Sequence, residues 1–150
     1  MNPKTLESKW QKKWAEAKAY ESEPGGAKEK YFVNCPYPYM NGYLHLGHAF
    51  TYLRADMVSR YQRMQDKNVL FPFAFHCTGT PIVAAAQRVE EGEETQIKAL
   101  KQMGLSDTLI KKFSNPEEWT KHFPDKAIQD LKKFGASIDW RRSFITTSLN

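Results

Sequence analysis

The sequence has few of the features that mark disulfide-stabilised, membrane or secreted proteins. Only two cysteines, Cys35 and Cys77, occur in 150 residues, too few for a disulfide framework or a cysteine-based structural zinc site. No apolar run approaches the ~20 residues that a transmembrane helix needs. The opening residues, "MNPKTLESKWQKKW", are charged and lack the apolar stretch of a signal peptide. We therefore expect reduced thiols, no membrane partner and a cytoplasmic protein.

The chain does have the size of one globular domain and a basic, aromatic composition. It is 41% hydrophobic and 13% aromatic, with a formal net charge of +5 at pH 7. Such a charge suits a polyanionic partner, for example a nucleotide or RNA. The lysines are spread over several predicted helices, however, and solvated helix faces would explain the charge equally well. Charge alone does not identify a function.

The first 30 residues predict a helix and a linker. From Pro3 to about Tyr20, apolar residues recur at steps of three and four, as on one face of a helix. These residues are Leu6, Trp10, Trp14 and Ala17. Asn2 can cap this helix, and Pro3 suits its first position. The segment "ESEPGGAKEK" (21–30) then breaks the pattern. Residues 1–30 are therefore predicted to form an appendage to the core.

From residue 30 to residue 92, strand and helix patterns alternate. "KYFVNCP" (30–36) and "NVLFPFAF" (68–75) predict strands, the second ended early by Pro72. Helices are predicted from about Leu46 to Gln65 and over 81–92, where Gly92 ends the second. The apolar positions of the first of these two helices are Phe50, Leu53, Met57, Tyr61 and Met64. This order predicts an α/β fold with a parallel sheet, right-handed crossovers and a ligand site at the carboxyl ends of the strands.

The rest of the chain predicts a helical insertion and a final extended segment. Helices are expected over 94–103, 106–113 and 116–134, the last capped by Asn115 and stopped by Gly135. Residues 136–150 should be extended. In this part Trp140 and Arg141 are expected to be structural, and Asp56 and Arg60 to form a salt bridge at a surface or interface. So few strands would make a small sheet, so the chain is interpreted as part of a larger fold.

Two unusual segments follow the predicted strands directly, and both should face one crevice: the turn at 36–48 and "HCTGTP" at 76–81. The first holds His45 and His48, which are three residues apart. A metal site could combine them with the other thiols and imidazoles, namely Cys35, His76 and Cys77. No C-x-x-C or H-x-x-x-H pair occurs, and no nearby carboxylate could orient the imidazoles. We therefore assign no metal ligand.

Two other interpretations of the histidines remain open. They could be satisfied locally at a helix start, although Gly47, which costs a helix ~1 kcal/mol relative to alanine, would then need a packing reason. Alternatively, the helix start binds a nucleotide phosphate through free N–H groups and the helix dipole. Gly42 would allow the tight turn, and Gly47 would let a purine or ribose lie against the backbone. Both histidines would then share a face and stabilise charge on an α-phosphate.

Three motifs resemble those of one enzyme family. "PYMNGYLHLGH" (38–48) resembles the HIGH signature of class I aminoacyl-tRNA synthetases, with leucine in place of isoleucine. "LFPFAFHCTGTPI" (70–82) resembles their second active-site segment, and "DWRRSFITTSLN" (139–150) the segment before the editing insertion. The opening "LESKWQKKWAEAKAY" is similar to their N-terminal helix. Together these motifs resemble the leucyl members of the archaeal and eukaryotic cytosolic type.

This resemblance implies roles for individual residues. Those implied to bind ATP are Asn41, Gly42, His45, Gly47 and His48, with both histidines catalytic. Those implied to bind the amino acid are Pro36, Tyr37, Tyr39 and His76. The imidazole of His76 stands where bacterial relatives carry an aspartate, and it can accept a hydrogen bond from an ammonium group without adding an opposite charge. The tyrosines could instead simply pack the turn, and His76 could bond its own loop.

The resemblance also implies an activity. ATP, with Mg²⁺ held through its phosphates, would activate leucine, and the leucyl group would pass to the 3′ end of tRNA(Leu). A multi-synthetase complex is a further expected partner. Residues 31–150 would form the first half of a Rossmann-like catalytic domain, ending near the editing insertion. The KMSKS loop has no counterpart in the sequence, so the 150-residue chain alone is expected to be inactive.

Three rival functions stay open from the sequence. A valyl- or isoleucyl-tRNA synthetase shares the same architecture. A small nucleotidyltransferase with an HxGH motif would account for residues 31–66 but not for "HCTGTP" or "DWRRSFITTS". A non-catalytic paralogue would bind RNA or a synthetase complex without any leucine-dependent ATP chemistry.

Overall fold

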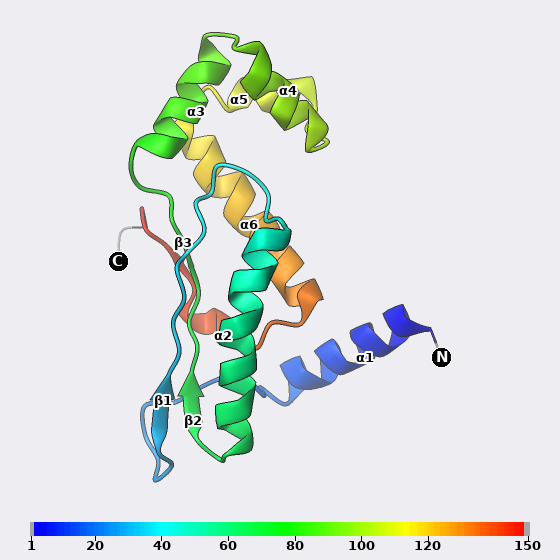
Figure 1. Ribbon diagram of the computed structural model, residues 1–150, viewed down its shortest axis with the longest axis vertical. Coiled ribbons are helices and arrows are strands. Elements are labelled where there is room, and N and C mark those ends of the chain that lie inside the picture. The colour runs from blue at the N-terminus through cyan, green and yellow to red at the C-terminus, as the bar shows by residue number, and fades with distance from the viewer. Residues whose placement is uncertain (1, 149–150) are drawn as a thin grey trace. The chain divides into compact units, whose positions relative to one another are not determined.

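The computed structural model describes residues 2–148 and shows the mixture of helices and short strands that the sequence predicts (Figure 1). Leu149 and Asn150, the last two residues of the predicted extended segment, lie outside the described part. The elements are, in order, α1 (Pro3–Glu16), β1 (Lys30–Phe32), α2 (Leu46–Met64), β2 (Asn68–Leu70), β3 (Ala74–Phe75), α3 (Thr80–Glu90), α4 (Glu94–Gln102), α5 (Asp107–Lys112), α6 (Pro116–Phe134), the 3₁₀ turn η1 (Trp140–Arg142) and β4 (Phe144–Ile145). No helix among residues 2–148 is both long and apolar enough to cross a membrane.

The chain divides into two compact units, and each is described by itself. The first comprises Met1–Tyr37, His45–Ala74 and Gln129–Phe144, and therefore holds α1, β1, α2, β2, the end of α6 and η1. The second comprises Pro38–Leu44, Phe75–Ile128 and Ile145–Asn150. It holds the loop before α2, the helices α3 to α5 and most of α6.

A parallel β-α-β arrangement forms the centre of the first unit and confirms the predicted α/β fold. β1 pairs with β2 in parallel, with Lys30, Tyr31 and Phe32 opposite Asn68, Val69 and Leu70, and α2 lies between them in sequence. β2 ends at Leu70, two residues before Pro72, whose nitrogen cannot donate to a ladder. The chain resumes as β3, which pairs with β4 in a second two-stranded sheet.

The helix ends follow the predicted capping residues. The Asn2 side chain accepts a hydrogen bond from the Lys4 N–H at 3.1 Å, and the Asn115 side chain accepts one from the Glu117 N–H at 3.0 Å. Gly135 follows α6 with φ of +79°, a left-handed conformation that glycine adopts without strain. α1 ends at Glu16, four residues before the predicted end. α6 continues through Pro124 and spans the whole predicted range, from residue 116 to residue 134.

Each unit has an apolar core of its own. In the first, Tyr52, Val69, Phe71, Phe73 and Ile138 are buried. The second buries Ile82, Leu100, Phe113, Trp119 and Phe123. In that core the Trp119 indole N–H donates to the Phe113 carbonyl at 2.7 Å, so its only polar group is satisfied.

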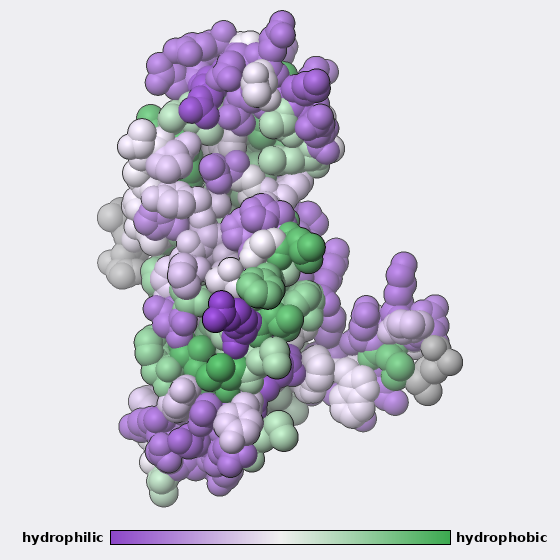
Figure 2. All heavy atoms as spheres, viewed as in Figure 1, coloured by the Kyte–Doolittle hydropathy of each residue, from purple (hydrophilic) through white to green (hydrophobic). Residues whose placement is uncertain are grey.

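The apolar face predicted for α2 does not enter the core. Its residues are exposed to between 41% and 81%: Phe50, Leu53, Met57, Tyr61 and Met64. The buried residues of α2 are instead Tyr52, Asp56 and Ser59, two of them polar. Figure 2 shows apolar side chains gathered over α2. α1 likewise has no buried residue, and its Trp10 is 46% exposed. The periodicity correctly predicted both helices but not which face of α2 is buried.

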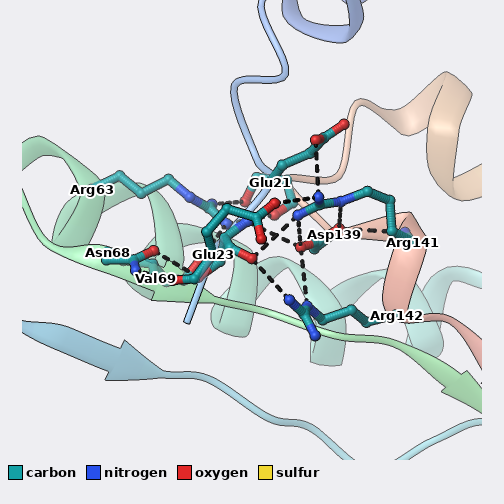
Figure 3. A network of polar contacts seen from close by, with 10 residues as sticks. Glu21, Glu23, Arg63, Asn68, Val69, Asp139, Arg141 and Arg142 are labelled. Carbon is teal, nitrogen blue, oxygen red and sulfur yellow. Dashed lines mark hydrogen bonds and ion pairs between the residues drawn. The ribbon is translucent and has the colours of Figure 1, made fainter. Parts of the chain in front are cut away.

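Two buried aspartates hold the first unit together. Asp56 accepts hydrogen bonds from the Ser137 N–H at 2.6 Å and from Arg60 Nε at 2.7 Å. The predicted Asp56–Arg60 salt bridge therefore forms, with its aspartate buried and its arginine partly exposed. Asp139 accepts from the Ser22 N–H at 3.0 Å and from two nitrogens of Arg141. Figure 3 shows this second network, in which Arg141 also reaches Glu21 and Glu23. Arg141 thus has the structural role expected of it.

Candidate active site

His45 and His48 stabilise the first turn of α2 with their own side chains. His45 is the N-cap residue, with extended backbone angles, and its Nδ1 accepts a hydrogen bond from the Gly47 N–H at 3.1 Å. His48 Nδ1 in turn accepts one from the His45 N–H at 3.2 Å. The ring centroids lie 3.9 Å apart. The pair therefore satisfies two backbone donors that the sequence analysis had left free for a phosphate.

These bonds determine which nitrogen of each ring is available. A neutral imidazole whose Nδ1 accepts a hydrogen bond carries its proton on Nε2. His45 is exposed and His48 is half-buried. Burial, followed by the nearby charge of His45, lowers the pKa of His48 below the usual 6.5, so this ring is neutral at pH 7. The arrangement therefore provides Nε2–H donors at a helix start, as a phosphate ligand requires.

The two glycines of the signature are explained by close contacts. A Cβ at Gly47 would lie 3.0 Å from His45 Cε1, a tight contact that the imidazole relieves only by shifting by a few tenths of an ångström. Gly47 thus has the packing reason that the sequence analysis required. A Cβ at Gly42 would lie 3.2 Å from the Met103 terminal methyl group. The φ of Gly42 is not in the left-handed region, so the constraint at this position comes from the neighbouring Met103 side chain.

An aromatic cluster in the first unit connects the predicted amino-acid side to the histidines. Tyr37 makes edge contacts with Phe73 and Phe144, at centroid distances of 6.1 and 5.8 Å. Phe73 also contacts Tyr52 at 4.9 Å, and Tyr52 stacks on His48 at 5.9 Å. Burial raises the pKa of both tyrosines. Tyr37 and His48 are therefore linked by an unbroken series of ring contacts. Pro36, beside Tyr37, is exposed.

In the second unit, Tyr39 and His76 pair through their backbones, as residues of two neighbouring parallel strands do. They form a parallel bridge in which the His76 N–H donates to the Pro38 carbonyl at 2.8 Å and the Met40 N–H donates to the His76 carbonyl at 3.1 Å. The two rings meet edge to face at 4.0 Å. The segments 36–48 and 76–81 therefore do lie side by side at this point. Asn41 is exposed and makes no side-chain hydrogen bond to residues 2–148.

The helical insertion supports the loop 38–44, which no pattern in the sequence predicts. Tyr43 Oη lies 3.2 Å from His122 Nε2, and the Tyr43 ring packs on Phe123 at 5.3 Å. Burial lowers the pKa of His122, so its ring is neutral and can share this hydrogen bond. The residues are 79 positions apart, and no local pattern links them. Gly79, with φ of +89° before α3, was also missed, although glycine before a proline at a helix start could have indicated it.

The thiols and imidazoles do not gather into a larger cluster. Among residues 2–148, no group of three histidine, cysteine or acidic side chains is placed to hold a metal ion. Cys35 and Cys77 are both buried and unpaired with each other, and burial raises the pKa of each thiol to about 11. The thiols are therefore protonated at neutral pH and poor nucleophiles.

Comparison with known proteins gives one consistent result. The profile of the family described as tRNA synthetases class I (I, L, M and V) matches residues 9–150. A leucine--tRNA ligase of Aeropyrum pernix is 49% identical over 147 residues, covering 98% of this chain and 15% of the relative. The cytoplasmic leucine--tRNA ligase of Pongo abelii is 38% identical, covering 98% of this chain and 17% of the relative. The chain thus spans about one sixth of these relatives.

A solved structure has the same fold. It is the ternary complex of Agrobacterium radiobacter K84 LeuRS, tRNA and LeuAMS, which matches with a TM-score of 0.71 and 24% sequence identity. The match covers 95% of this chain and 15% of that chain. At this identity it supports the architecture of the chain and not its ligands.

Proposed function

This chain belongs to the family of class I tRNA synthetases (I, L, M and V), and on that basis we propose that it is the ATP-binding part of a leucine--tRNA ligase. The observation that carries the proposal is the start of α2, where the two capping imidazoles keep their Nε2–H groups for a ligand. The names of the similar ligases support leucine as the amino acid.

The proposed reaction begins when the leucine carboxylate attacks the α-phosphorus of ATP. The bond from the α-phosphorus to the bridging oxygen breaks, pyrophosphate leaves, and leucyl-adenylate remains. The carboxylate is already ionised at neutral pH, so no general base is required. His45 and His48 would donate Nε2–H hydrogen bonds to the α-phosphate oxygens. These bonds strengthen as negative charge builds up there, which favours the transition state over bound ATP.

The remaining site residues are proposed to bind the two substrates. Asn41, whose side chain is exposed, would contact ATP, and Gly42 and Gly47 would let it approach the backbone. Backbone atoms of Pro36 and Tyr37 would receive the amino group of leucine, with Tyr39 against its side chain. His76 would accept one hydrogen bond from the ammonium group through a neutral ring. Its edge contact with Tyr39 supports a shared role for the pair.

The wider biochemical context is proposed from the relatives. Mg²⁺ would bind mainly through the phosphates of ATP. The leucyl group would then pass to the 3′ end of tRNA(Leu). Association with a multi-synthetase complex is also proposed, and copurification tests it. The name of the Pongo abelii ligase supports a cytoplasmic location. Residues 1–30 would form an N-terminal helix and linker, and residues 31–150 the first half of a Rossmann-like catalytic domain that ends near an editing insertion.

A chimeric enzyme tests the amino acid specificity. In this chimera the present chain replaces the aligned segment of the Aeropyrum pernix ligase, which is 49% identical. We expect ATP–pyrophosphate exchange to depend on leucine and to fall by at least about a hundredfold with valine or isoleucine. Exchange that prefers valine or isoleucine would assign the chain to that branch of the family. Exchange with none of the three would favour a non-catalytic RNA-binding paralogue.

A further inference from the structure

The ring of His48 lies on the ring of Tyr52, one turn further along α2. The two residues are four positions apart and therefore share a face of the helix. Their ring centroids are 5.9 Å apart and the ring planes differ by 17°, which is an offset stack. The hydrogen bond from the His45 N–H to His48 Nδ1 is 3.2 Å long, at the upper end of the usual range. This bond holds one nitrogen, whereas the stack holds the plane of the ring.

Tyr52 is itself held by the core of the first unit. It is 4% exposed, and its ring meets the buried Phe73 ring edge to face, with centroids 4.9 Å apart and an angle of 86° between the planes. Phe73 in turn contacts the rings of Tyr37 and Trp140. A side chain enclosed in this way keeps one orientation, because neighbouring atoms fill the space into which it would turn. Tyr52 is therefore a rigid surface for His48.

The two signature histidines differ in this support. His45 is exposed, and its ring lies 3.9 Å from that of His48 between centroids. His48 is half-buried and rests on Tyr52 as well. The core of the first unit therefore reaches the signature through the ring of His48.

The covering of His48 also affects its protonation. Burial is the main cause of its lowered pKa, and the charge of His45 adds to the effect. The Cys35 thiol, which acts on Tyr52, has a pKa of about 11 and is therefore uncharged at pH 7. A protonated imidazole carries a hydrogen on both nitrogens and could not accept the bond from the His45 N–H. A covered, neutral His48 therefore keeps both its bond to the backbone and the direction of its Nε2–H.

We propose that Tyr52 is a positioning residue for adenylate formation: its ring, held by Phe73, keeps the His48 imidazole in the orientation in which Nε2–H can donate to an α-phosphate oxygen. Tyr52 acts only through His48 and does not itself contact the substrates. The inference rests on the role proposed for His48. It extends that role by making the reaction depend on a buried tyrosine that lies outside the signature segment 38–48.

Nuclear magnetic resonance of the 150-residue chain tests this contact without any activity. The chain has four histidines, and His48→Ala identifies the signals of His48. We expect cross-relaxation between the ring protons of His48 and Tyr52 in the unsubstituted chain. Tyr52→Phe keeps the ring and should leave the pKa of His48 unchanged, whereas Tyr52→Leu should raise it toward the usual 6.5, because water then reaches the imidazole. Tyr61→Leu, the same change at an exposed position of α2, is the matched control and should leave this pKa unchanged.

Leucine-dependent exchange by the chimera tests the consequence for the reaction. Tyr52→Leu should lower kcat by about tenfold or more with little change in the KM for ATP, whereas Tyr52→Phe should stay within about twofold of the unsubstituted chimera. The loss should disappear when the imidazole is already absent. In a His48→Ala background, Tyr52→Leu should therefore cost less than about twofold, whereas a merely structural role predicts that the two losses multiply.

The proposal is wrong if the unsubstituted chain shows no cross-relaxation between the two rings, if Tyr52→Leu leaves the pKa of His48 unchanged, or if the losses multiply in the double variant. Should Tyr52→Leu not fold, as judged by circular dichroism, Tyr52→Met takes its place with the same expected results, because its longer, flexible side chain fills more of the space. If His48→Ala leaves exchange unchanged, it is the proposed function of His48 that fails, and the resonance measurements still decide whether Tyr52 holds the ring.

Discussion

At the scale of single residues, one side chain often performs two tasks. Each signature histidine caps the helix with Nδ1 and keeps Nε2–H for a ligand. The bonds that hold the rings also set their tautomer, so in the proposed mechanism the cap itself would preorganise the two Nε2–H donors for a phosphate. Asp56 and Asp139 likewise satisfy backbone N–H groups and arginines together. The stability of the first unit should therefore depend strongly on these two carboxylates.

Removing the Asp56 carboxylate should destabilise the chain. Asp56→Ala leaves the buried Ser137 N–H without an acceptor and Arg60 without its partner. Losing one partner of a buried ion pair costs about 3–5 kcal/mol, and the partial exposure of Arg60 reduces this to about 2–3 kcal/mol. Urea unfolding followed by circular dichroism measures the change. Glu29→Ala, in the exposed pair with Lys67, is the control and should cost less than about 1 kcal/mol. Equal losses would contradict this account.

Asp139 should make the chain sensitive to acid. Burial by itself would raise the pKa of Asp139, but hydrogen bonds from Arg141 and the Ser22 N–H outweigh it and lower the pKa below 3.8. A carboxyl whose folded pKa is lowered contributes stability above its unfolded pKa, and that stability is lost as the pH falls through the folded pKa. The urea concentration at the unfolding midpoint should therefore decrease as the pH falls below about 4. Asp139→Asn should weaken this dependence of the midpoint on pH. If the dependence is unchanged in Asp139→Asn, other groups cause the loss of stability in acid.

At the scale of elements, the start of α2 contains a glycine that lowers helix propensity but leaves room for the His45 ring. Glycine in a first turn is worse than alanine by about 1 kcal/mol, yet Gly47 leaves space for the His45 ring. The helical insertion contributes in a similar way, because Tyr43, His122 and Phe123 hold the loop before α2. Within each unit, these contacts fix residues that the proposed function uses.

Gly47→Ala should therefore separate stability from function. Its Cβ would lie 3.0 Å from His45 Cε1, so the exposed ring must shift by a few tenths of an ångström, which weakens its cap on the Gly47 N–H. The gain in propensity and the loss of the cap are each about 1 kcal/mol and should nearly cancel in urea unfolding. In the chimera, leucine-dependent exchange should fall by at least about tenfold, since one Nε2–H is misplaced. Thr51→Ala, one turn further along, is the matched control. Retained exchange with Gly47→Ala would show that the orientation of His45 is unimportant.

The sequence predicted most elements because their signals are local. Asn2, Asn115 and Gly135 act within a few residues of the helix ends that they define, and Pro72 ends β2 through its own missing N–H. The contacts that it did not predict join distant segments, such as Tyr43 with His122. The buried face of α2 was missed for a further reason. Apolar periodicity shows that one face of a helix is apolar, but it does not show whether this chain or another segment covers that face.

At the scale of the whole molecule, the chain matches the class I tRNA synthetase family over residues 9–150 but does not have the length of its relatives. It covers about one sixth of them. Among residues 2–148, one edge of β1 has no strand partner, and an apolar face of α2 is exposed, made of Leu46, Phe50, Leu53, Met57, Tyr61 and Met64. Exposed apolar surface of this extent marks an interaction site. The isolated chain should therefore be a poor enzyme even if it folds.

The isolated chain should not catalyse leucine-dependent ATP–pyrophosphate exchange above background. In the proposed mechanism His45 and His48 donate to the α-phosphate, but no motif in the sequence supplies the lysines that bind the pyrophosphate side of ATP. Loss of such a group typically costs a hundredfold or more, on the order of 3–4 kcal/mol of transition-state stabilisation. Exchange by the isolated chain at the rate of the chimera would contradict this prediction.

The most direct test of the central claim is leucine-dependent exchange by the chimera with and without the two imidazoles. His45→Ala and His48→Ala should each lower kcat by about a hundredfold or more, with a smaller effect on the KM for ATP, because the lost bonds act mainly in the transition state. Lys9→Ala on exposed α1 should match the unsubstituted chimera. If exchange persists in the histidine double variant at the unsubstituted rate, the imidazoles do not act on ATP and the proposed mechanism is wrong.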